Sequence, residues 1–379
     1  MEWKEVRLGD VCTRVCSGGT PKSTNLSYYG GKIPWLNTKE IDFNRIYSTE
    51  KTITDSGLNN SSAKWIVPNT VTVAMYGATA GKSCIVKVPM TTNQACCNLT
   101  INDEVADDEF VYYTLKNDYT TLASLANGGA QQNLNAQIIK DYVLKMPSLA
   151  DQRRIASILS SLDRKIELNN KINADLEEMA QAIFKNWFVD FEPFKDGKFV
   201  DSELGMIPEG WKVGCLGDLI TIKYGKDHKK LEDGTFPVYG SGGFMRFVNS
   251  WLYDGESVLI PRKGTLDNIM YVCEKFWTVD TMFFSVPKMD YVMKYVYNYI
   301  KRFDFSKMNE GTSVPSNTAA RLNKMPILIP THEILEMYDE TLCPIYNKRK
   351  MKDKESRILS LLRDTLLPRL MSGELEVPE

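Results

Sequence analysis

The sequence lacks the long apolar segments and the leader that mark membrane-spanning and exported proteins. No run of about 18 apolar residues occurs in the 379-residue chain, and its first residues, Met-Glu-Trp-Lys, do not begin a signal peptide. Hydrophobic residues still make up 43% of the chain and aromatic residues 11%, which is enough for folded cores. We therefore expect two or three globular domains that work in the cytoplasm.

Metal-binding and catalytic patterns are also missing. The chain has only two histidines, His228 and His332, and none of its eight cysteines forms a C-x-x-C pair. A zinc site is therefore not expected, and free thiols in a reducing compartment are favoured. No Asn-Pro-Pro or Asp-Pro-Pro motif and no glycine pair that opens a Rossmann helix occurs. No catalytic residue is predicted.

The chain also lacks an excess of positive charge. Its formal net charge of −2 argues against a protein that binds nucleic acid through bulk basicity. When the chain is divided into residues 1–149, 150–204, 205–331 and 332–379, only residues 205–331 are net positive, with 16 Lys and Arg against 13 Asp and Glu. Any affinity for DNA must therefore come from local patches or be shared with a partner.

What the chain does contain is an internal repeat. Trp3-Lys4 and Leu8-Gly9-Asp10 recur 208 residues later, at 211–212 and 216–218. Gly128 and the pair at 147–148 recur after only 183 residues, at 311 and 330–331. The smaller second shift means that the second copy is shorter and has diverged. Two similar modules indicate a protein that reads or holds two similar, but not identical, things.

Each module has short apolar runs broken by Gly, Pro and Asn, which predicts an α+β domain with irregular loops. In the first module we expect a helix over 109–125 and strands at 66–67, 71–75, 84–86 and 98–101. In the second we expect a helix over 292–302 and strands at 219–223, 257–260, 270–273 and 282–286.

A long helix is predicted to follow each module. The first begins with a capping box at Ser148 and Asp151 and carries a heptad ladder about 40 residues, or roughly 60 Å, long. Its rungs are Ile155, Leu159, Leu162, Ile166, Asn169, Asn173, Leu176, Ala180, Ile183 and Trp187. A coiled-coil seam is favoured over one amphipathic helix on a globular core, with the two mid-seam asparagines fixing the register.

The second long helix is predicted from about Thr331 to Met371. Pro344 should kink or restart it, and Leu359, Leu366 and Leu370 give its last part an apolar side. Equivalent helices in a duplicated chain should pair antiparallel, related by a pseudo-twofold axis. The expected division is a first domain at 1–147, a helix at 148–192, a linker at 193–210, a second domain at 211–330, a helix at 331–371 and a tail at 372–379.

With this organisation the chain resembles the specificity subunits of type I restriction-modification systems, over nearly its whole length. In the first module the phrases that carry the resemblance are SGGTPKS at 17–23, YYGGKIPWLN at 28–37, YGATAGK at 76–82 and TTNQ at 91–94. Around the helices they are GGAQQNLN at 128–135, MPSLADQRRIA at 146–156, AIFKNWFVDFEP at 182–193, LGMIPEGWKVGCLGDL at 204–219 and LLPRLMSGEL at 366–375. The second module departs more, with GSGG at 240–243 and GTSVPSN at 311–317.

The resemblance implies a reader of DNA that is not itself catalytic. Each globular module would be a target-recognition domain for one half of an asymmetric, bipartite DNA site. The paired helices would set the unread gap and dock two methyltransferase subunits, through which restriction and translocase subunits join. S-adenosylmethionine would then belong to the methyltransferase, and ATP and Mg²⁺ to the restriction partner. The helix length agrees with half-sites about one DNA turn, some 34–36 Å, apart.

Candidate DNA contacts are amide side chains for base edges and cations for phosphates or guanine. In the first module they are Asn93, Gln94, Gln131, Gln132 and Asn133, with Lys22, Lys32 and Lys82. In the second they are Lys223, Lys226, Lys229, Lys230, Arg262, Lys263 and Asn317. For each amide the alternative is a hydrogen bond that braces a loop. For the basic patch at 226–230 the alternative is a solvated surface loop.

Two other functions stay open. The loop at 77–83 has three residues between its glycines where a P-loop has four, so a phosphate-binding enzyme is a weak alternative. A turn that presents Lys82 to a DNA phosphate, or a purely structural turn, is favoured there. The other alternative is a scaffold that binds methyltransferase subunits and does not read DNA.

Overall fold

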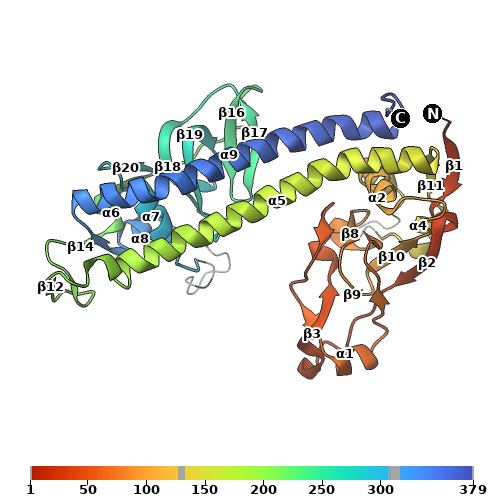
Figure 1. The fold of residues 1–379 in the computed structure, drawn as a ribbon, viewed down its shortest axis with the longest axis horizontal. Coiled ribbons are helices and arrows are strands. Elements are labelled where there is room, and N and C mark those ends of the chain that lie inside the picture. Colours follow the sequence, from red (N-terminus) through yellow and green to blue (C-terminus); the bar gives the residue numbers. More distant parts are fainter. Residues whose placement is uncertain (1, 127–132, 306, 308–315, 378–379) are drawn as a thin grey trace. The chain divides into compact units, whose positions relative to one another are not determined.

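The computed structural model describes residues 2–126, 133–305, 307 and 316–377, which fall into two compact units. The first unit comprises Met1–Asn169 with Lys354–Glu379, and the second comprises Asn170–Asp353. The two long helices, α5 (Leu149–Phe188) and α9 (His332–Met371), each give one part to the first unit and one part to the second (Figure 1).

The first unit is built on small sheets. A five-stranded sheet has the order β2-β10-β7-β8-β4, a four-stranded sheet has the order β5-β3-β9-β6, and β1 pairs with β11. The strands of the larger sheet are β2 (Cys12–Ser17), β4 (Arg45–Ile46), β7 (Val71–Ala74), β8 (Ser83–Val86) and β10 (Cys96–Ile101). The others are β1 (Lys4–Arg7), β3 (Tyr29–Leu36), β5 (Thr52–Ile53), β6 (Trp65–Ile66), β9 (Met90–Thr92) and β11 (Val143–Met146).

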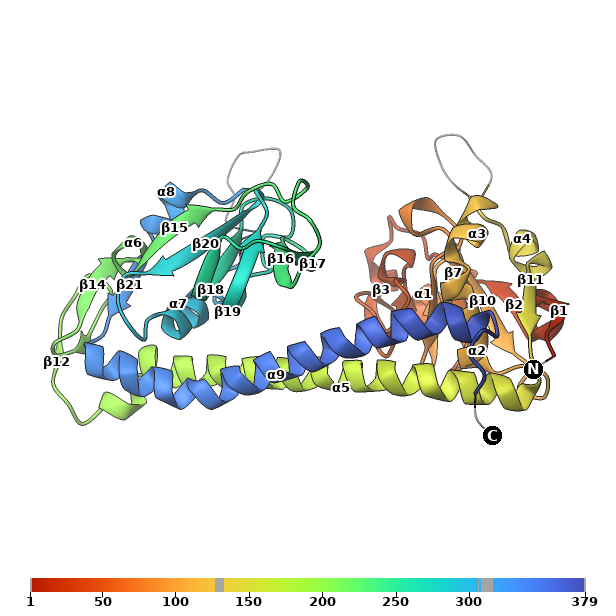
Figure 2. The same ribbon diagram turned by 90° about the horizontal axis from the view of Figure 1, so that it is seen from above.

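Helix α2 (Asp108–Asn117) lies between the five-stranded sheet and α5 in this unit (Figure 2). Its N-cap is Asp107, whose side chain accepts from the Phe110 backbone N–H. The shorter helices are α1 (Asp55–Asn59), α3 (Tyr119–Ser124) and α4 (Ala136–Asp141). The single helix expected over 109–125 is therefore two, because Asp118 leaves the helix and its carboxylate accepts from Asn117 and Tyr142.

The second unit holds a six-stranded sheet in the order β15-β20-β18-β19-β16-β17, with α7 (Met293–Ile300) between the sheet and α9 (Figure 2). The strands of this sheet are β15 (Ile220–Tyr224), β16 (Phe236–Gly240), β17 (Gly243–Val248), β18 (Tyr253–Pro261), β19 (Met270–Thr278) and β20 (Met282–Pro287). Two pairs complete the unit: β12 (Phe199–Val200) with β13 (Ile207–Pro208), and β14 (Lys212–Cys215) with β21 (Pro326–Ile329). Its short helices are α6 (Leu216–Leu219) and α8 (Ala319–Asn323).

Strand pairing confirms the duplication residue by residue. In the first unit Lys4 faces Met146 across the pair β1–β11. In the second Lys212 faces Ile329 across β14–β21. These partners are the first pair displaced by the predicted shifts, 208 for the first strand and 183 for the last. Each domain therefore begins and ends on one two-stranded ribbon that leads into a long helix.

The shift of 183 also relates the buried positions of the two helices. On α5, Ile155 and Leu159 enter the core of the first unit. Their counterparts on α9, Tyr338 and Leu342, enter the core of the second. The remaining parts exchange roles, because Leu367 and Met371 of α9 join the first core where Phe184 and Phe188 of α5 join the second.

Contacts between the helices run antiparallel inside each unit. In the first unit Arg363 meets Asp163 and Glu355 meets Asn169. In the second, Asp353 meets Asn173 and Arg349 meets Glu177. The predicted seam residues of the two helices differ in burial. Ile155, Leu159, Asn169 and Ala180 of the α5 ladder and Leu370 of α9 are buried, whereas the half-buried ones are Leu162, Ile166, Asn173, Leu176, Ile183 and Trp187 of the ladder and Leu359 and Leu366 of α9.

Helix α9 runs through Pro344 without interruption, so the expected restart there is wrong. Proline removes one backbone hydrogen bond, but its neighbours Leu342, Ile345 and Tyr346 are buried in the core of the second unit. That packing holds the helix on both sides of the proline. Within the residues that the structure describes, no helix is long and apolar enough to cross a membrane.

Candidate nucleic-acid interface

The same backbone arrangement closes one end of the central strand in both domains. In the first unit the Met75 N–H, just past β7, donates to the Ala95 carbonyl at 2.8 Å, and the Leu134 N–H donates to the Met75 carbonyl at 2.8 Å. In the second the Arg262 N–H, just past β18, donates to Thr281 at 2.8 Å, and the Asn317 N–H donates to Arg262 at 3.0 Å. We call the residues gathered at this place the strand-end surface of each unit.

A glycine loop borders each strand-end surface. It follows β2 in the first unit and β15 in the second, where Gly18 and Gly225 have no room for a side chain. A Cβ would lie 2.2 Å from the Thr92 carbonyl oxygen in the first case and 2.1 Å from the Val279 carbonyl oxygen in the second. An indole fixes each loop further: Trp35 donates to the Gly19 carbonyl and Trp277 to the Lys226 carbonyl, both at 2.9 Å.

Three of the sequence phrases of the first module meet at its glycine loop. The Tyr29 hydroxyl donates to the Pro21 carbonyl at 2.6 Å, and the Thr20 hydroxyl donates to the Gln94 side chain. Residues 17–23, 28–37 and 91–94 are thereby tied together. Of the predicted contacts, Lys22 lies on this loop and Gln94 is bonded to it, while Lys32 lies on β3, which Tyr29 ties to the loop; all three are exposed.

Lys82 is less accessible to a DNA phosphate than the sequence indicated. Its ammonium lies 2.5 Å from the Asp42 carboxylate and 5.9 Å from the centre of the Phe43 ring, and its side chain is 26% exposed. The turn before it is a short 3-10 helix, Gly77–Thr79. Lys82 therefore presents a charge that Asp42 already neutralises in part.

The amide candidates divide into buried and exposed side chains. Asn93 is buried, donating to the Asn37 side chain and accepting from the Ala95 N–H. Asn317 is also buried and donates to the Pro261 carbonyl. These contacts favour loop-bracing roles for both side chains. Asn133, in contrast, is exposed, and its backbone forms an isolated β-bridge with Tyr76. Gln131 and Gln132 lie outside the described residues.

In the second unit one of the predicted cations, Arg262, stacks on an exposed aromatic ring. Arg262 stacks 5.0 Å from the centre of the Tyr224 ring, and its guanidinium donates to the Asp280 carbonyl at 2.7 Å. Tyr224 itself is 54% exposed. The exposed lysines near the glycine loop and the end of β18 are Lys223, Lys226, Lys229, Lys230 and Lys263.

Sequence reasoning missed the residue that shapes the basic loop at 226–233. Arg246 of β17 donates to the carbonyls of His228 and Leu231, both at 2.8 Å, and pairs with Asp233 at 3.2 Å. This clamp presents Lys229 and Lys230 on a fixed loop. An arginine on a strand gives no local signal that it reaches a loop 15 residues earlier. Tyr76 and Tyr224 were also missed, although a tyrosine directly before a glycine after a predicted strand is a visible cue.

The thiols and acids do not assemble a metal site in the part of the chain that the structure describes, where no group of three or more His, Cys, Asp or Glu is placed to hold an ion. Burial raises the pKa of Cys12 and of Cys97 to about 12, so both stay protonated near neutrality. Protonated, buried thiols are poor nucleophiles and poor metal ligands.

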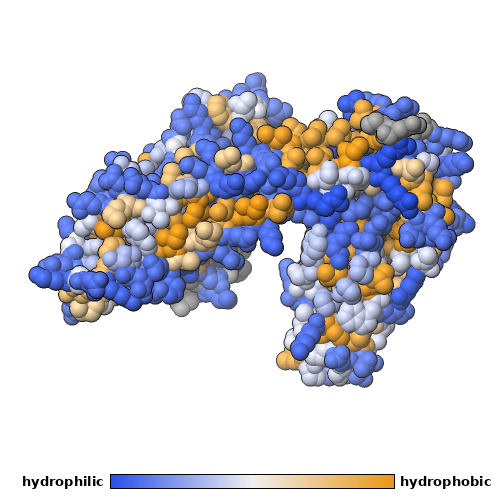
Figure 3. All heavy atoms as spheres, viewed as in Figure 1, coloured by the Kyte–Doolittle hydropathy of each residue, from blue (hydrophilic) through white to orange (hydrophobic). Residues whose placement is uncertain are grey.

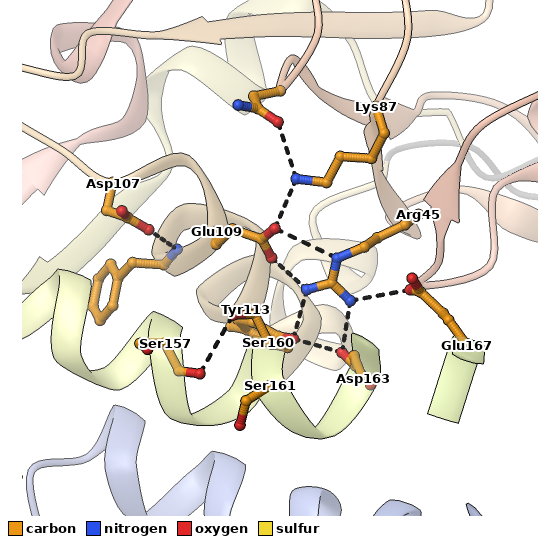
Figure 4. A network of polar contacts seen from close by, with 12 residues as sticks. Arg45, Lys87, Asp107, Glu109, Tyr113, Ser157, Ser160, Ser161, Asp163 and Glu167 are labelled. Carbon is orange, nitrogen blue, oxygen red and sulfur yellow. Dashed lines mark hydrogen bonds and ion pairs between the residues drawn. The ribbon is translucent and has the colours of Figure 1, made fainter. Parts of the chain in front are cut away.

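Behind the first strand-end surface, a buried polar network joins the domain to its helices (Figure 4). Arg45 of β4 is at its centre and pairs with Glu109 of α2, with Asp163 at 3.3 Å and with Glu167 at 3.2 Å. Lys87 reaches Glu109 at 2.7 Å. Burial alone would raise the pKa of Glu109 and Asp163, but hydrogen bonds from Arg45 to Glu109, and from Tyr113 and Arg363 to Asp163, outweigh it and lower both.

Two repeated domains with matching loop surfaces, fixed to two shared helices, define a scaffold that recognises two related targets. A family model described as the type I restriction modification DNA specificity domain matches residues 1–178 and 208–352. The chain belongs to this family. It is a DNA sequence-recognition subunit of a type I restriction-modification system, in which the enzymatic activities lie in partner subunits.

Individual relatives agree with this assignment. The chain is 28% identical over 420 residues to the MjaIX specificity subunit of a type I restriction enzyme from Methanocaldococcus jannaschii, covering 100% of this chain and 94% of that one. It is 22% identical to the HindI specificity subunit from Haemophilus influenzae, over 72% and 79% of the two chains. A crystal structure of a type I S subunit from M. genitalium shares the fold, with a TM-score of 0.60, 20% identity and coverage of 98% and 96%.

Proposed function

We propose that each domain reads one half of an asymmetric, bipartite DNA site through its strand-end surface. The observation that carries the proposal is that the two surfaces share a backbone frame but differ in side chains. Exposed amides and lysines surround the first, at Lys22, Lys32, Gln94 and Asn133. The second has Arg262 stacked on Tyr224 and exposed lysines on the neighbouring segments. A common frame with different side chains suits two readers of different sequences.

Within these surfaces we assign different roles to the candidates. The exposed lysines at 22, 32, 223, 226, 229, 230 and 263 are phosphate contacts, and Arg262 is held for a phosphate or a guanine. Gln94 and Asn133 are the exposed amide side chains that we assign to base edges. Gln131 and Gln132, outside the described residues, stay candidates from the sequence alone. Asn93 and Asn317 brace the loops, and Lys82 acts through its pair with Asp42.

The test is a base-resolution methylation map of DNA from a methylation-free host that expresses the chain with its methyltransferase subunit. A single two-part motif with a fixed gap is expected. Exchanging residues 205–330 for another second module should change one half-site only. A complex that assembles but leaves the DNA unmethylated would instead favour a scaffold that does not read DNA.

Salt dependence checks the phosphate contacts separately. Lys229→Ala should lower the slope of log affinity against log salt by about one, because one fewer counterion is released. Lys198→Ala, an exposed lysine of the linker, is the matched control and should leave the slope unchanged. An unchanged slope for Lys229→Ala would remove that lysine from the interface.

We further propose that α5 and α9 set the unread gap and dock two methyltransferase subunits. In support of docking, apolar side chains gather over the C-terminal part of α9 (Figure 3). Ile358, Leu361 and Leu362 of the first unit are 58%, 69% and 45% exposed, and their spacing places them on one face of the helix. S-adenosylmethionine would bind the methyltransferase, and ATP and Mg²⁺ the restriction subunit, with the assembly acting on DNA in the cytoplasm.

Leu361→Asp should weaken capture of the methyltransferase subunit about tenfold or more, since it places a charge in a buried apolar contact. Leu26→Asp is the matched control, because Leu26 is 82% exposed on a loop of the first domain. Equal capture by both variants would argue against docking on this face. Adding residues to α5 should change the gap and leave both half-sites as they were.

A further inference from the structure

In each unit, a single carboxylate of α5 joins the globular domain to both long helices. In the first unit Asp163 accepts from the Tyr113 hydroxyl of α2 at 2.5 Å and pairs with Arg363 of α9 at 2.6 Å. In the second, Glu177 accepts from the Tyr297 hydroxyl of α7 at 2.8 Å and pairs with Arg349 of α9 at 2.5 Å. We call these two triads, each a tyrosine, a carboxylate and an arginine, the locks.

The locks are not copies made by the duplication. The shift of 183 between the long helices places Tyr346, not a carboxylate, at the counterpart of Asp163, and Ala180 at the counterpart of Arg363. The domain helices align with a different register, in which Tyr113 corresponds to Asn298. The same chemistry has therefore been reached at positions that are not equivalent.

Their spacing matches the coiled-coil repeat. Fourteen residues separate Asp163 from Glu177 on α5, and fourteen separate Arg349 from Arg363 on α9. Fourteen is two heptads, so the two locks use the same heptad position in the sequence of each helix. Between them in sequence, Asn169 donates to Glu355 at 3.1 Å and Asn173 donates to Asp353 at 2.6 Å. Polar contacts at fixed heptad positions specify register, which an apolar seam alone leaves less defined.

We propose that the locks are positioning residues for target recognition: each fixes how its domain is held on the helix pair, and so limits the gap lengths at which both half-sites are read. This rests on the proposed function. The lock residues lie behind the strand-end surfaces, on helices that carry none of the candidate base contacts. Loosening a lock should therefore broaden the accepted gap and leave the sequence of each half-site unchanged.

The experiment uses the assembled methyltransferase complex with the full chain. Plasmids carry the two half-sites at the native gap and at gaps one base pair shorter and longer, and native DNA sequencing gives the methylated fraction of each. Tyr113→Phe and Tyr297→Phe each remove one hydroxyl. The ratio of off-gap to native-gap methylation should rise about tenfold, the size of one hydrogen bond to a charged group. Asp175→Asn, an exposed carboxylate of α5, is the control and should keep the wild-type ratio.

A charge exchange separates the two locks. The double variant Glu177→Arg with Arg349→Glu should methylate at the native gap as selectively as the wild type, because the ion pair is simply reversed. Asp163→Arg with Arg363→Asp should not, because Arg45, now 3.3 Å from the Asp163 carboxylate, would face a second guanidinium.

Three outcomes would count against these ideas. An equal fall in methylation at all gaps would make the locks structural only, and an altered half-site would make their residues readers; either overturns the inference. A wild-type complex that methylates no bipartite motif would overturn the proposed function itself. The wild-type plasmid set therefore tells the two failures apart.

Discussion

The two units attach a similar domain to the same pair of helices through the same kind of triad, but the groups packed around that triad differ. In the first unit the guanidinium of Arg45 is almost fully buried among three carboxylates, two of them on α5. In the second unit the ion pairs of Lys294 with Asp339 and of Arg349 with Glu177 lie beside an aromatic cluster. In that cluster the Phe188 ring is 4.7 Å from Tyr295 and 4.8 Å from Tyr338. The difference teaches that the same architecture can centre its domain-to-helix contact on one buried arginine or on a cluster of rings.

Substitutions should destabilise the ion network of the first unit and the aromatic cluster of the second unit in different ways. A buried ion network depends on every partner, because removing one leaves the others charged and desolvated. An aromatic cluster loses contact area in proportion to what is removed, and its rings do not change charge with pH. Substitutions at the two joints therefore offer direct ways to break or sharpen the contrast.

The largest effect is expected from Arg45→Ala. It leaves Glu109, Asp163 and Glu167 without their shared cation, which should destabilise the first unit by about 3–5 kcal/mol. Hydrogen exchange should rise in peptides covering 108–117 and stay unchanged over 293–300. Arg7→Ala, whose arginine is exposed in an ion pair with Asp10, is the control; equal exchange in both variants would refute the special role of Arg45.

The second-largest effect is expected from acid, which should weaken the contact between the domain and the long helices in the first unit. The folded-state pKa values of Glu109 and Asp163 lie below their ordinary values of 4.5 and 3.8. The unfolded chain therefore takes up protons first as pH falls, so this stabilisation is present above about pH 5 and is lost as pH falls through the lowered folded-state pKa values. Exchange over 108–117 should accelerate below pH 4.5 more than exchange over 293–300. A parallel rise in both peptides would contradict this prediction.

A smaller loss is expected from Phe188→Leu in the second unit. The change keeps an apolar side chain in the cluster and should cost less than about 1.5 kcal/mol. The cost should be the same at low and at high salt, since no charge is involved. Exchange over 293–300 at two salt concentrations measures it, and a strong salt dependence would show that the aromatic joint also relies on ions.

The smallest effect has the opposite sign. Burial and then the neighbouring Asp107 raise the pKa of Asp108 to about 6. Its folded form holds a proton more tightly than the unfolded chain, so its cost appears as pH rises from about 4 through 6. Asp108→Asn should then stabilise the first unit by about 1 kcal/mol at pH 7 and by little at pH 4. Thermal unfolding at both pH values checks this, and equal gains would exclude titration as the cause.

Much of the fold could be predicted because repeats and heptads leave local marks. The duplication was predicted from the repeated Trp-Lys and Leu-Gly-Asp, although the ribbon strands beside these repeats were not predicted. Helix α9 begins at His332 and ends at Met371, as the apolar pattern indicated. Strands such as β3 and β17 were missed, because glycines and exposed side chains obscure their alternation. The joints could not be foreseen either: nothing in the sequence near Arg45 indicates that it meets residues 109, 163 and 167.

The candidate site shows the same limit. The phrases at 17–23, 28–37 and 91–94 were noted in the sequence as carriers of the family resemblance, and the structure ties them together. Which amides were exposed could not be predicted, because burial of Asn93 and Asn317 depends on loops far away in the chain. The clamp by Arg246 on the basic loop is likewise set by tertiary contact alone.

Because the chain is synthesised from its N-terminus, the cores of the two units become complete at different times. Leu367, Leu370 and Met371 complete the core of the first unit, together with residues such as Leu8 and Phe110 made hundreds of codons earlier. The second unit uses only residues 170–353. A ribosome therefore delivers everything the later domain needs before the earlier domain can close. Nonsense mutations between codons 354 and 366 should spare the second domain and leave the first with an open core.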